Sequence, residues 1–357
     1  MRRQDEEPES HFILRWQRKL ALSSSYETNK DINLEYNLSL VFKNIDSEKV
    51  TNEVESTLEY DKTKETYSSP LDSICDTNVV GMRFVYKGCK NLKYLDANYR
   101  LPSQTDNLMQ TFLNCKKLEF LPDTFIVPES VTDMRGTFSN CEKLGKLSPN
   151  FRIPVNCTAT SSLFNNCSAL ATLPNGFKIP DGVYEIDSMF RGCTSLKNLN
   201  SDFTMPMQID GTSGCSKMFE NCTSLETLPT SFKLPVSVCG EYDNMFKNCS
   251  SLNLPAGIFT LEMVNSQQGI TTEGMFEGCS SLTSFPINSF TADGCVHDNM
   301  YAGCTNITGT IIITSDGDFI GFADGTTKSI TIKYSEDFQL SQISDTCENT
   351  NVTYIKN

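Results

Sequence analysis

The fold of this chain is decided by one stretch that then recurs along the sequence, Phe125-Ile126-Val127-Pro128-Glu129-Ser130-Val131-Thr132-Asp133-Met134-Arg135-Gly136-Thr137-Phe138-Ser139-Asn140-Cys141. Its last residues begin a pattern in which an aromatic residue is followed three residues later by cysteine, and three further on by leucine or isoleucine. The pattern occurs nine times, in rows headed by Tyr86, Phe112, Phe138, Phe164, Phe190, Phe219, Phe246, Phe276 and Tyr301. Successive cysteines are 26 residues apart four times in a row, and 25 to 30 apart elsewhere. Self-similarity at such a period predicts a solenoid in which each repeat forms one coil.

Two further positions predict how each coil turns. The residue before every row cysteine is glycine or asparagine, the residues that most readily adopt a left-handed backbone. We therefore expect a short helical turn that carries the aromatic and ends in a left-handed cap, followed by a short strand. Proline then recurs in six repeats, from Pro102 to Pro235, where it removes an amide donor and forces a turn. The sequence thus predicts an α+β repeat solenoid, whose nine rows, stacked about 4.8 Å apart, span roughly 40 Å.

The quoted stretch resembles a known family, as does the run Met189-Phe190-Arg191-Gly192-Cys193-Thr194-Ser195-Leu196. Both look like the BspA-like leucine-rich repeats of bacterial, phage and protist surface proteins, in their 26-residue variant. Repeat length, cysteine phase and the Met-Phe-x-Gly/Asn-Cys run agree together over about residues 82 to 307. The resemblance implies a curved binding solenoid without catalytic activity. We accordingly expect nine leucine-rich repeats over residues 81–307.

The two ends of the chain lie outside this pattern. Residues 1–80 contain 10 basic and 16 acidic residues and one alternating apolar segment, which predicts a β-rich N-terminal cap or docking module. In residues 308–357 we expect strands at 311–314, 329–334 and 352–355, forming a β-rich C-terminal cap over the open end of the core. Asp316-Gly317 and Asp324-Gly325 are interpreted as hairpin turns, because the spaced oxygen ligands of a calcium loop are absent.

One cysteine per repeat predicts a column of inward-pointing thiols. The column consists of Cys89, Cys115, Cys141, Cys167, Cys193, Cys222, Cys249, Cys279 and Cys304. Parallel side chains in neighbouring coils do not face each other, so we expect buried free thiols rather than disulfides. No Cys-x-x-Cys pair occurs and the two histidines are far apart, so neither a metal nor a cofactor is expected.

Charge and the scarcity of histidine argue against several functions. The chain has a net charge of -14, so we expect no binding to nucleic acid. No segment is long and apolar enough for membrane insertion, and no export signal is recognisable. His11 and His297 accompany no nucleophile motif, and His297 falls at a core phase of the repeat. We therefore expect a protein that is not an enzyme; a glycan hydrolase that uses paired carboxylates is the remote alternative.

Irregular repeat lengths mark a candidate binding edge. The extra residues fall within 207–217, 236–244 and 260–274, always between the proline turn and the next aromatic row. Insertions at one phase lie on one edge of a solenoid, and such an edge often binds a ligand. Neutral drift in tolerant loops explains them equally well. The candidate residues are Met207, Gln208, Asp210, Glu241, Tyr242, Glu262, Asn265 and Gln267.

Together these features favour a non-catalytic recognition or attachment protein. The resemblance implies an adhesin-like solenoid that binds a protein or glycan on a host surface. Residues 1–80 lie outside the repeat, and we expect them to contact other subunits. The reduced thiol ladder and the lack of a recognisable export signal favour synthesis in the cytoplasm and association with a phage virion or a cell surface. Two alternatives stay open: a virion structural or assembly protein that binds only other subunits, and an anchored bacterial cell-surface adhesin.

Overall fold

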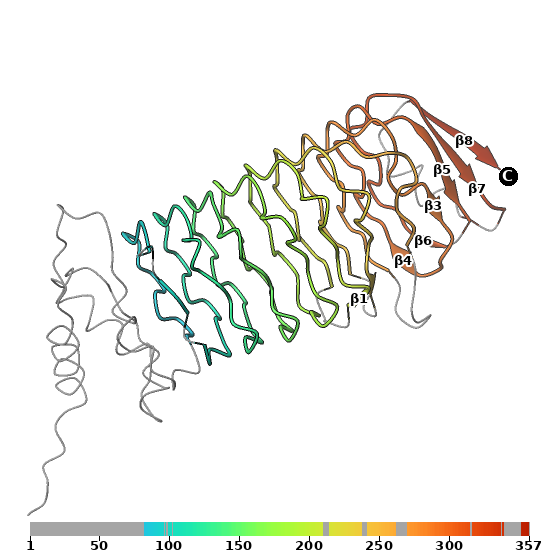
Figure 1. Cartoon of the computed structure of the whole chain (residues 1–357). Coiled ribbons are helices and arrows are strands. Elements are labelled where there is room, and N and C mark those ends of the chain that lie inside the picture. The colour runs from blue at the N-terminus through green and yellow to red at the C-terminus, as the bar shows by residue number, and fades with distance from the viewer. Residues whose placement is uncertain are drawn as a thin grey trace, which may run out of the picture.

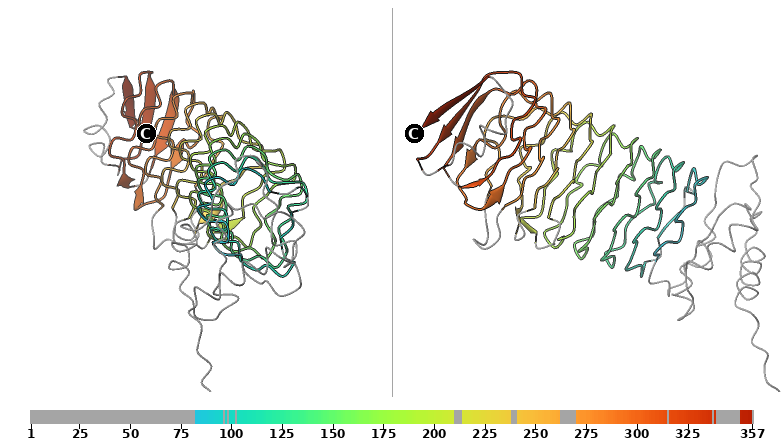
Figure 2. Two further views of the ribbon diagram at one scale, coloured as in Figure 1. Left: turned by 90° about the vertical axis from the view of Figure 1, so that its left-hand side faces the viewer. Right: turned by 180° about the vertical axis from the view of Figure 1, so that it is seen from behind.

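The computed structural model describes residues 82–356, apart from residues 96, 98, 102, 210–213, 238–240, 262–269, 315, 337 and 339–350. The described residues form one elongated solenoid, whose coils stack along its axis and end in a group of longer strands (Figure 1). The view from behind shows the same parallel stacking (Figure 2). The module predicted for residues 1–80 lies outside the described residues.

Short parallel strands are the regular secondary structure of the described residues. They are β1 (Gln208–Ile209), β2 (Val236–Ser237), β3 (Ser289–Phe290), β4 (Cys295–Val296), β5 (Gly309–Ile313), β6 (Gly317–Asp318), β7 (Ile330–Tyr334) and β8 (Val352–Lys356). β1 pairs with β2, β4 pairs with β6, and the other four form a parallel sheet in the order β3-β5-β7-β8. In the earlier coils the predicted strand is a ladder of single bridges, such as Tyr94–Phe120–Lys146. This part of the chain contains no helix, so the repeat solenoid is confirmed but the helical half of the predicted α+β class is corrected.

The segment that was predicted as a helical turn is a run of tight turns. The amide of Phe138 donates to the carbonyl of Leu163 in the next coil (2.9 Å), whereas the amide of Cys141 donates back to Phe138 (3.0 Å). Gly136 and Asn140 each have a φ of 59°, which an α-helix does not accommodate. Alternate amides therefore bond to the neighbouring coil, and no continuous helical series of hydrogen bonds forms.

The left-handed backbone predicted before each row cysteine is confirmed at all nine positions, which are Gly88, Asn114, Asn140, Asn166, Gly192, Asn221, Asn248, Gly278 and Gly303. A second left-handed residue precedes each of these by four positions. This second set is Phe84, Gln110, Gly136, Ser162, Ser188, Lys217, Asn244, Gly274 and Asn299. Its residue types are too varied to be recognised in the sequence. Left-handed residues on both sides of the row aromatic turn the chain through this corner of the coil without a helix.

The core is filled by two columns of aromatic rings. Phe138 stacks on Phe112 and Phe164 with centroid distances of 5.3 and 5.7 Å, and it meets Phe151 of the second column edge-on at 6.0 Å. The first column comprises the nine row aromatics, and the second comprises Tyr99, Phe125, Phe151, Phe177, Phe203, Phe232 and Phe259, all buried. Aromatic rings at the same position of neighbouring repeats stack on one another. Each additional coil therefore extends one continuous apolar core.

The three strands predicted near the C-terminus are confirmed as β5, β7 and β8. Thr310, Thr331 and Thr353 are in register across them. Because the three strands are parallel, the hairpins predicted at Asp316-Gly317 and Asp324-Gly325 are wrong. Parallel neighbours need a connection that returns around the coil, and these residues lie in that connection.

The coil pattern continues beyond the ninth row. The amide of Gly303 donates to the carbonyl of Asp324 (2.6 Å), and Gly325 has a φ of 70°, close to the 72° of Gly303. These are the contacts of the next coil in the series. Ala323 and Thr326 take the places of the aromatic and the cysteine in this coil, which is why the sequence pattern stops before it.

Candidate binding surfaces

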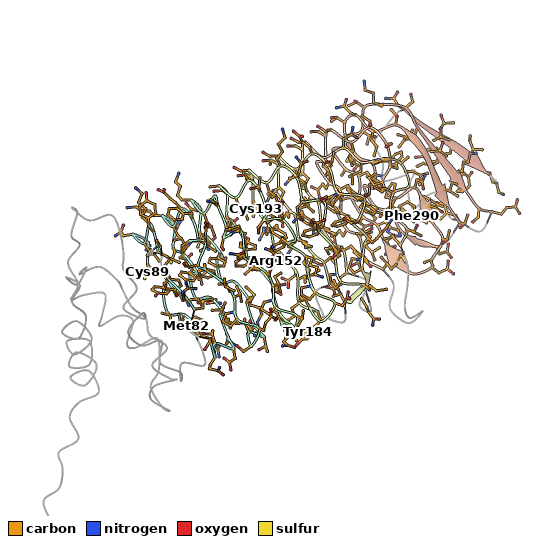
Figure 3. All side chains as sticks on the ribbon, in the orientation of Figure 1. Met82, Cys89, Arg152, Tyr184, Cys193 and Phe290 are labelled. Carbon is orange, nitrogen blue, oxygen red and sulfur yellow. The ribbon has the colours of Figure 1, made fainter. Side chains whose placement is uncertain are left out.

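The row cysteines form a buried column along the solenoid, and Figure 3 labels two of them, Cys89 and Cys193. From Cys115 onward each thiol donates to the carbonyl of the row aromatic in the preceding coil, as Cys167 Sγ does to the Phe138 oxygen at 3.1 Å. None of the twelve cysteines in the described part of the chain forms a disulfide with another of them. Burial raises the pKa of the row thiols from Cys115 onward, to about 12 at Cys222, so these eight thiols carry no thiolate for nucleophilic chemistry at neutral pH. The column is therefore structural, because a small side chain fills the core while its thiol bonds to a backbone carbonyl.

Asparagines at the left-handed position form a second ladder. Asn140 Nδ2 donates to Asn114 Oδ1, and Asn166 Nδ2 donates to Asn140 Oδ1, both at 2.9 Å. Asn248 donates to Asn221 in the same way at 3.0 Å. A side-chain amide can donate and accept at once, so asparagine both tolerates the left-handed backbone and links three coils.

His297 is a core residue, as its phase predicted. It is 2% exposed, and its Nδ1 lies 2.8 Å from Thr272 Oγ1. Burial lowers its pKa to about 3, so the ring is neutral at physiological pH. Its ring packs against Phe290 and Phe319 at centroid distances of 4.6 and 5.0 Å. A base in this position has no access to a substrate.

The candidate edge is only partly described. Met207 is 78% exposed and Gln208 is also exposed, and β1, which contains Gln208, pairs with β2 of the next coil. The amide of Met207 donates to Asp181 Oδ1 at 3.1 Å, which attaches the start of the loop to the preceding coil. Glu241 is half-buried. Asp210, Glu262, Asn265 and Gln267 lie outside the described residues.

Tyr242 does not belong to this edge. It is 1% exposed, and its hydroxyl donates to the Pro235 carbonyl at 2.6 Å. Tyr242 lies four residues before Phe246, just as Met134 lies four residues before Phe138. Side chains at this position of the repeat point into the core. The assignment of Tyr242 to the binding edge is therefore corrected, and the repeat phase was the signal that could have prevented it.

Sequence reasoning missed an outward-facing group on the first three described coils. Tyr94, Phe120 and Lys146 are in register along the bridge ladder, and Phe120 is 36% exposed. The rings of Tyr94 and Phe120 have centroids 5.2 Å apart, and Lys93 Nζ lies 5.0 Å from the Tyr94 ring centroid. The available signal was two aromatics exactly one repeat apart, each five residues after a row cysteine.

Charge is unevenly distributed along the solenoid. Residues 82–178 contain 12 basic and 7 acidic residues, whereas residues 179–357 contain 8 basic and 21 acidic residues. In the acidic half, burial and then repulsion from Asp243 and Asp187 raise the pKa of Glu241. Burial and the nearby Asp318 likewise raise the pKa of Asp298, against a backbone hydrogen bond that lowers it. The solenoid therefore has a basic N-terminal half and an acidic C-terminal half.

Within the described ranges, no cluster of histidine, cysteine, aspartate and glutamate is arranged to hold a metal ion. A search of the same residues for a helix of membrane-spanning length and apolarity returned none.

The coils are similar to one another, with columns of aromatic and cysteine side chains in the core and different side chains on the outside of each coil. This arrangement defines a repeat scaffold of the class that mediates protein interactions. The family model described as BspA type leucine rich repeat region matches in six copies, over residues 81–197, 109–253 and 174–323. These matches cover more than half of the sequence, so the chain belongs to the BspA type leucine-rich repeat family, as its repeats predicted. A search of curated proteins found no match.

Proposed function

We propose that this protein is a non-catalytic recognition protein that attaches its carrier to a host surface through side chains on the outside of the solenoid. The observation that carries the proposal is the contrast between the two sides of each coil. Inward positions repeat almost unchanged, whereas the outward position of Phe120 holds Tyr94, Lys146, Thr172 and Asn198 in other coils. A recognition scaffold requires inward residues that are the same in every coil and outward residues that differ from coil to coil.

The chemistry of the interior supports a role without catalysis. The family is an interaction scaffold. Neutral, buried His297 and the protonated thiol column supply neither a base nor a nucleophile to the surface.

The partner in this proposal is a protein or glycan on a host surface. Residues 1–80 connect the chain to other subunits, and the carrier is a phage virion or a cell surface. Mass spectrometry of purified virions and of cell fractions tests the location: the chain should be enriched in one of them, and recovery only from the soluble cytosol would refute the attachment role.

The candidate edge provides the binding test. Shortening 207–217 by three residues, to the standard repeat length, should leave the melting temperature nearly unchanged, because loop length has a small effect on stability. The same variant should bind host cells more weakly than the wild type in a pull-down or flow-cytometry assay. Wild-type binding by this variant would place recognition on another face.

Assembly with other subunits is the second candidate, and one observation favours it. Among the described residues β8 is the last strand of its sheet and pairs only with β7. An edge strand of this kind presents unpaired backbone groups to another chain. The amide of Ile330 in β7 donates to the carbonyl of Asn351, so the alternating amide of Val352 faces away from β7. Replacing Val352 with proline should then abolish concentration-dependent association in light scattering, and association that persists would exclude this edge as the contact.

A further inference from the structure

A pair of aromatic rings, the half-buried Tyr94 and the exposed Phe120, lies on the basic half of the solenoid. Tyr94 and Phe120 are consecutive members of the bridge ladder, with ring centroids 5.2 Å apart and planes inclined by 38°. Phe120 is 36% exposed, although every row aromatic of the core is buried. The two rings therefore form a small apolar platform on the outside of two neighbouring coils.

Three lysines lie on the coil of Phe120 or on the next coil. Lys146 follows Phe120 in the ladder, and Lys143 lies three residues before it on the same coil. Both are exposed, and neither forms an ion pair with another described residue. Lys117 is exposed and donates to Asn91 Oδ1 at 3.0 Å, which holds its ammonium group without neutralising its charge. We call Tyr94, Phe120, Lys117, Lys143 and Lys146 the aromatic–lysine surface.

The aromatic–lysine surface is confined to three coils. The positions equivalent to Phe120 hold Thr172, Asn198 and Thr227 in the following coils. The positions equivalent to Lys143 hold Ala169, then Ser195 and Ser224. Other lysines of the solenoid, on these coils and beyond them, are paired with the next coil, as Lys116 is with Glu142 at 2.7 Å and Lys197 is with Glu226 at 3.1 Å. Unpaired positive charge beside exposed rings is therefore a local property of this surface.

We propose that the aromatic–lysine surface binds an acidic oligosaccharide, one that carries carboxylate or sulfate groups. The C–H face of a sugar ring packs on the electron-rich faces of Tyr94 and Phe120. Its anionic groups receive hydrogen bonds from the ammonium groups of Lys117, Lys143 and Lys146, which come from adjacent coils about 4.8 Å apart. The inference rests on the proposed recognition function and names a ligand class and a site for it.

Charge favours a short acidic glycan over a nucleic acid. A polynucleotide carries a charge on every residue and would extend from these three coils over the half of the solenoid that contains 21 acidic and 8 basic residues. Repulsion there opposes binding of a long polyanion. A glycan of a few sugars needs only the three basic coils.

The test uses the full-length protein and four fluorescent probes: a sulfated glycosaminoglycan oligosaccharide, an oligogalacturonate, a neutral dextran oligosaccharide and a single-stranded DNA oligonucleotide. Affinity is measured by fluorescence anisotropy at several salt concentrations. Two variants are tested, Phe120→Thr and the double variant Lys143→Ser with Lys146→Thr. Each introduces residues that occur at the equivalent positions of other coils, so the fold should be retained. The matched control, Lys178→Thr with Lys233→Thr, removes the same charge from another edge. Melting temperatures within about 2 °C of wild type establish that all variants are folded.

The wild type should bind the sulfated or the carboxylated probe, more weakly as salt increases, and should not bind dextran. The lysine variant should lose at least about tenfold in affinity and show a flatter salt dependence, and Phe120→Thr should lose about tenfold with the salt dependence unchanged. The control should bind as the wild type does. Failure to bind both acidic glycans, or equal binding by the wild type and both variants, would overturn the proposal. DNA binding that is as tight and is lost in the same variants would assign the surface to nucleic acid instead and also overturn it.

Host attachment is measured separately with the same variants. If Phe120→Thr loses glycan binding but still attaches to host cells, the glycan site is supported and attachment depends on another face. If the wild type binds neither acidic glycan but the 207–217 loop variant loses attachment, the glycan site is refuted and the recognition function is retained.

Discussion

Asn140 combines a left-handed backbone with a place in the side-chain ladder, and two substitutions separate these contributions. Its φ is 59°, and its side chain donates to Asn114 and accepts from Asn166, both at 2.9 Å. Asn140→Gly keeps the backbone free of strain but removes both side-chain hydrogen bonds. Asn140→Val removes the same bonds and also places a β-branched residue in the left-handed region.

The magnitudes follow from these contacts. Each lost hydrogen bond costs about 0.5–1.5 kcal/mol net, and partial exposure of the ladder favours the lower values, so Asn140→Gly should lower the free energy of unfolding by about 1–2 kcal/mol. Asn140→Val should cost about 1–2 kcal/mol more, because a side chain with a β-carbon is strained at positive φ. The free energies are measured by urea denaturation followed by circular dichroism.

Lys217→Gly is the matched control. Lys217 is exposed and has a φ of 60°, but it belongs to the second left-handed set and not to the asparagine ladder. Relief of about 1–2 kcal/mol of strain, reduced by a glycine entropy cost of about 0.5–1 kcal/mol, should leave this variant slightly stabilised. Equal stability of Asn140→Gly and Asn140→Val would refute the backbone argument, and wild-type stability of Asn140→Gly would refute the ladder.

Three further predictions concern titratable and reactive groups. His297 has a pKa lowered to about 3 by burial, so the unfolded state takes up its proton first, and stability present above pH 6.5 should be lost as the pH falls towards 3. His297→Phe, which copies Phe319 of the next coil, should reduce that loss in urea midpoints measured from pH 7 to pH 4, and an unchanged slope would contradict the burial of the ring. Burial and nearby carboxylates raise the pKa of Glu241, so the contribution of Glu241 to stability, opposite in sign to that of His297, should increase as the pH falls from 7 to 5 and decrease again as it rises. Glu241→Gln should stabilise the protein at pH 7 and flatten this rise, whereas destabilisation would show that the charged form makes a favourable contact. The row cysteines from Cys115 onward should react with iodoacetamide only after denaturation, because their thiols are buried and protonated, and a disulfide between neighbouring row cysteines in peptide maps would disprove this.

The helical turn shows where sequence reasoning failed and why. An aromatic residue, a cysteine and a Gly or Asn cap are compatible with a helical turn when only local preferences are considered. The amide of Phe138 instead donates to Leu163, 25 residues away, and this bond exists only once the coils have stacked. The same stacking imposes the left-handed backbone at the second position. Residues as different as Gln110 and Lys217 occupy this position, so the sequence does not reveal it.

The sequence by itself determined the repeat, its inward positions and the first left-handed position. These are visible because every coil must present the same shape to its neighbours, so residues such as Phe138, Asn140 and Cys141 recur at one spacing. The tertiary structure alone decided which outward residues become neighbours. Tyr94, Phe120 and Lys146 are 26 residues apart in the chain and meet because parallel coils stack in register, so the aromatic–lysine surface is assembled from residues that are distant in the sequence.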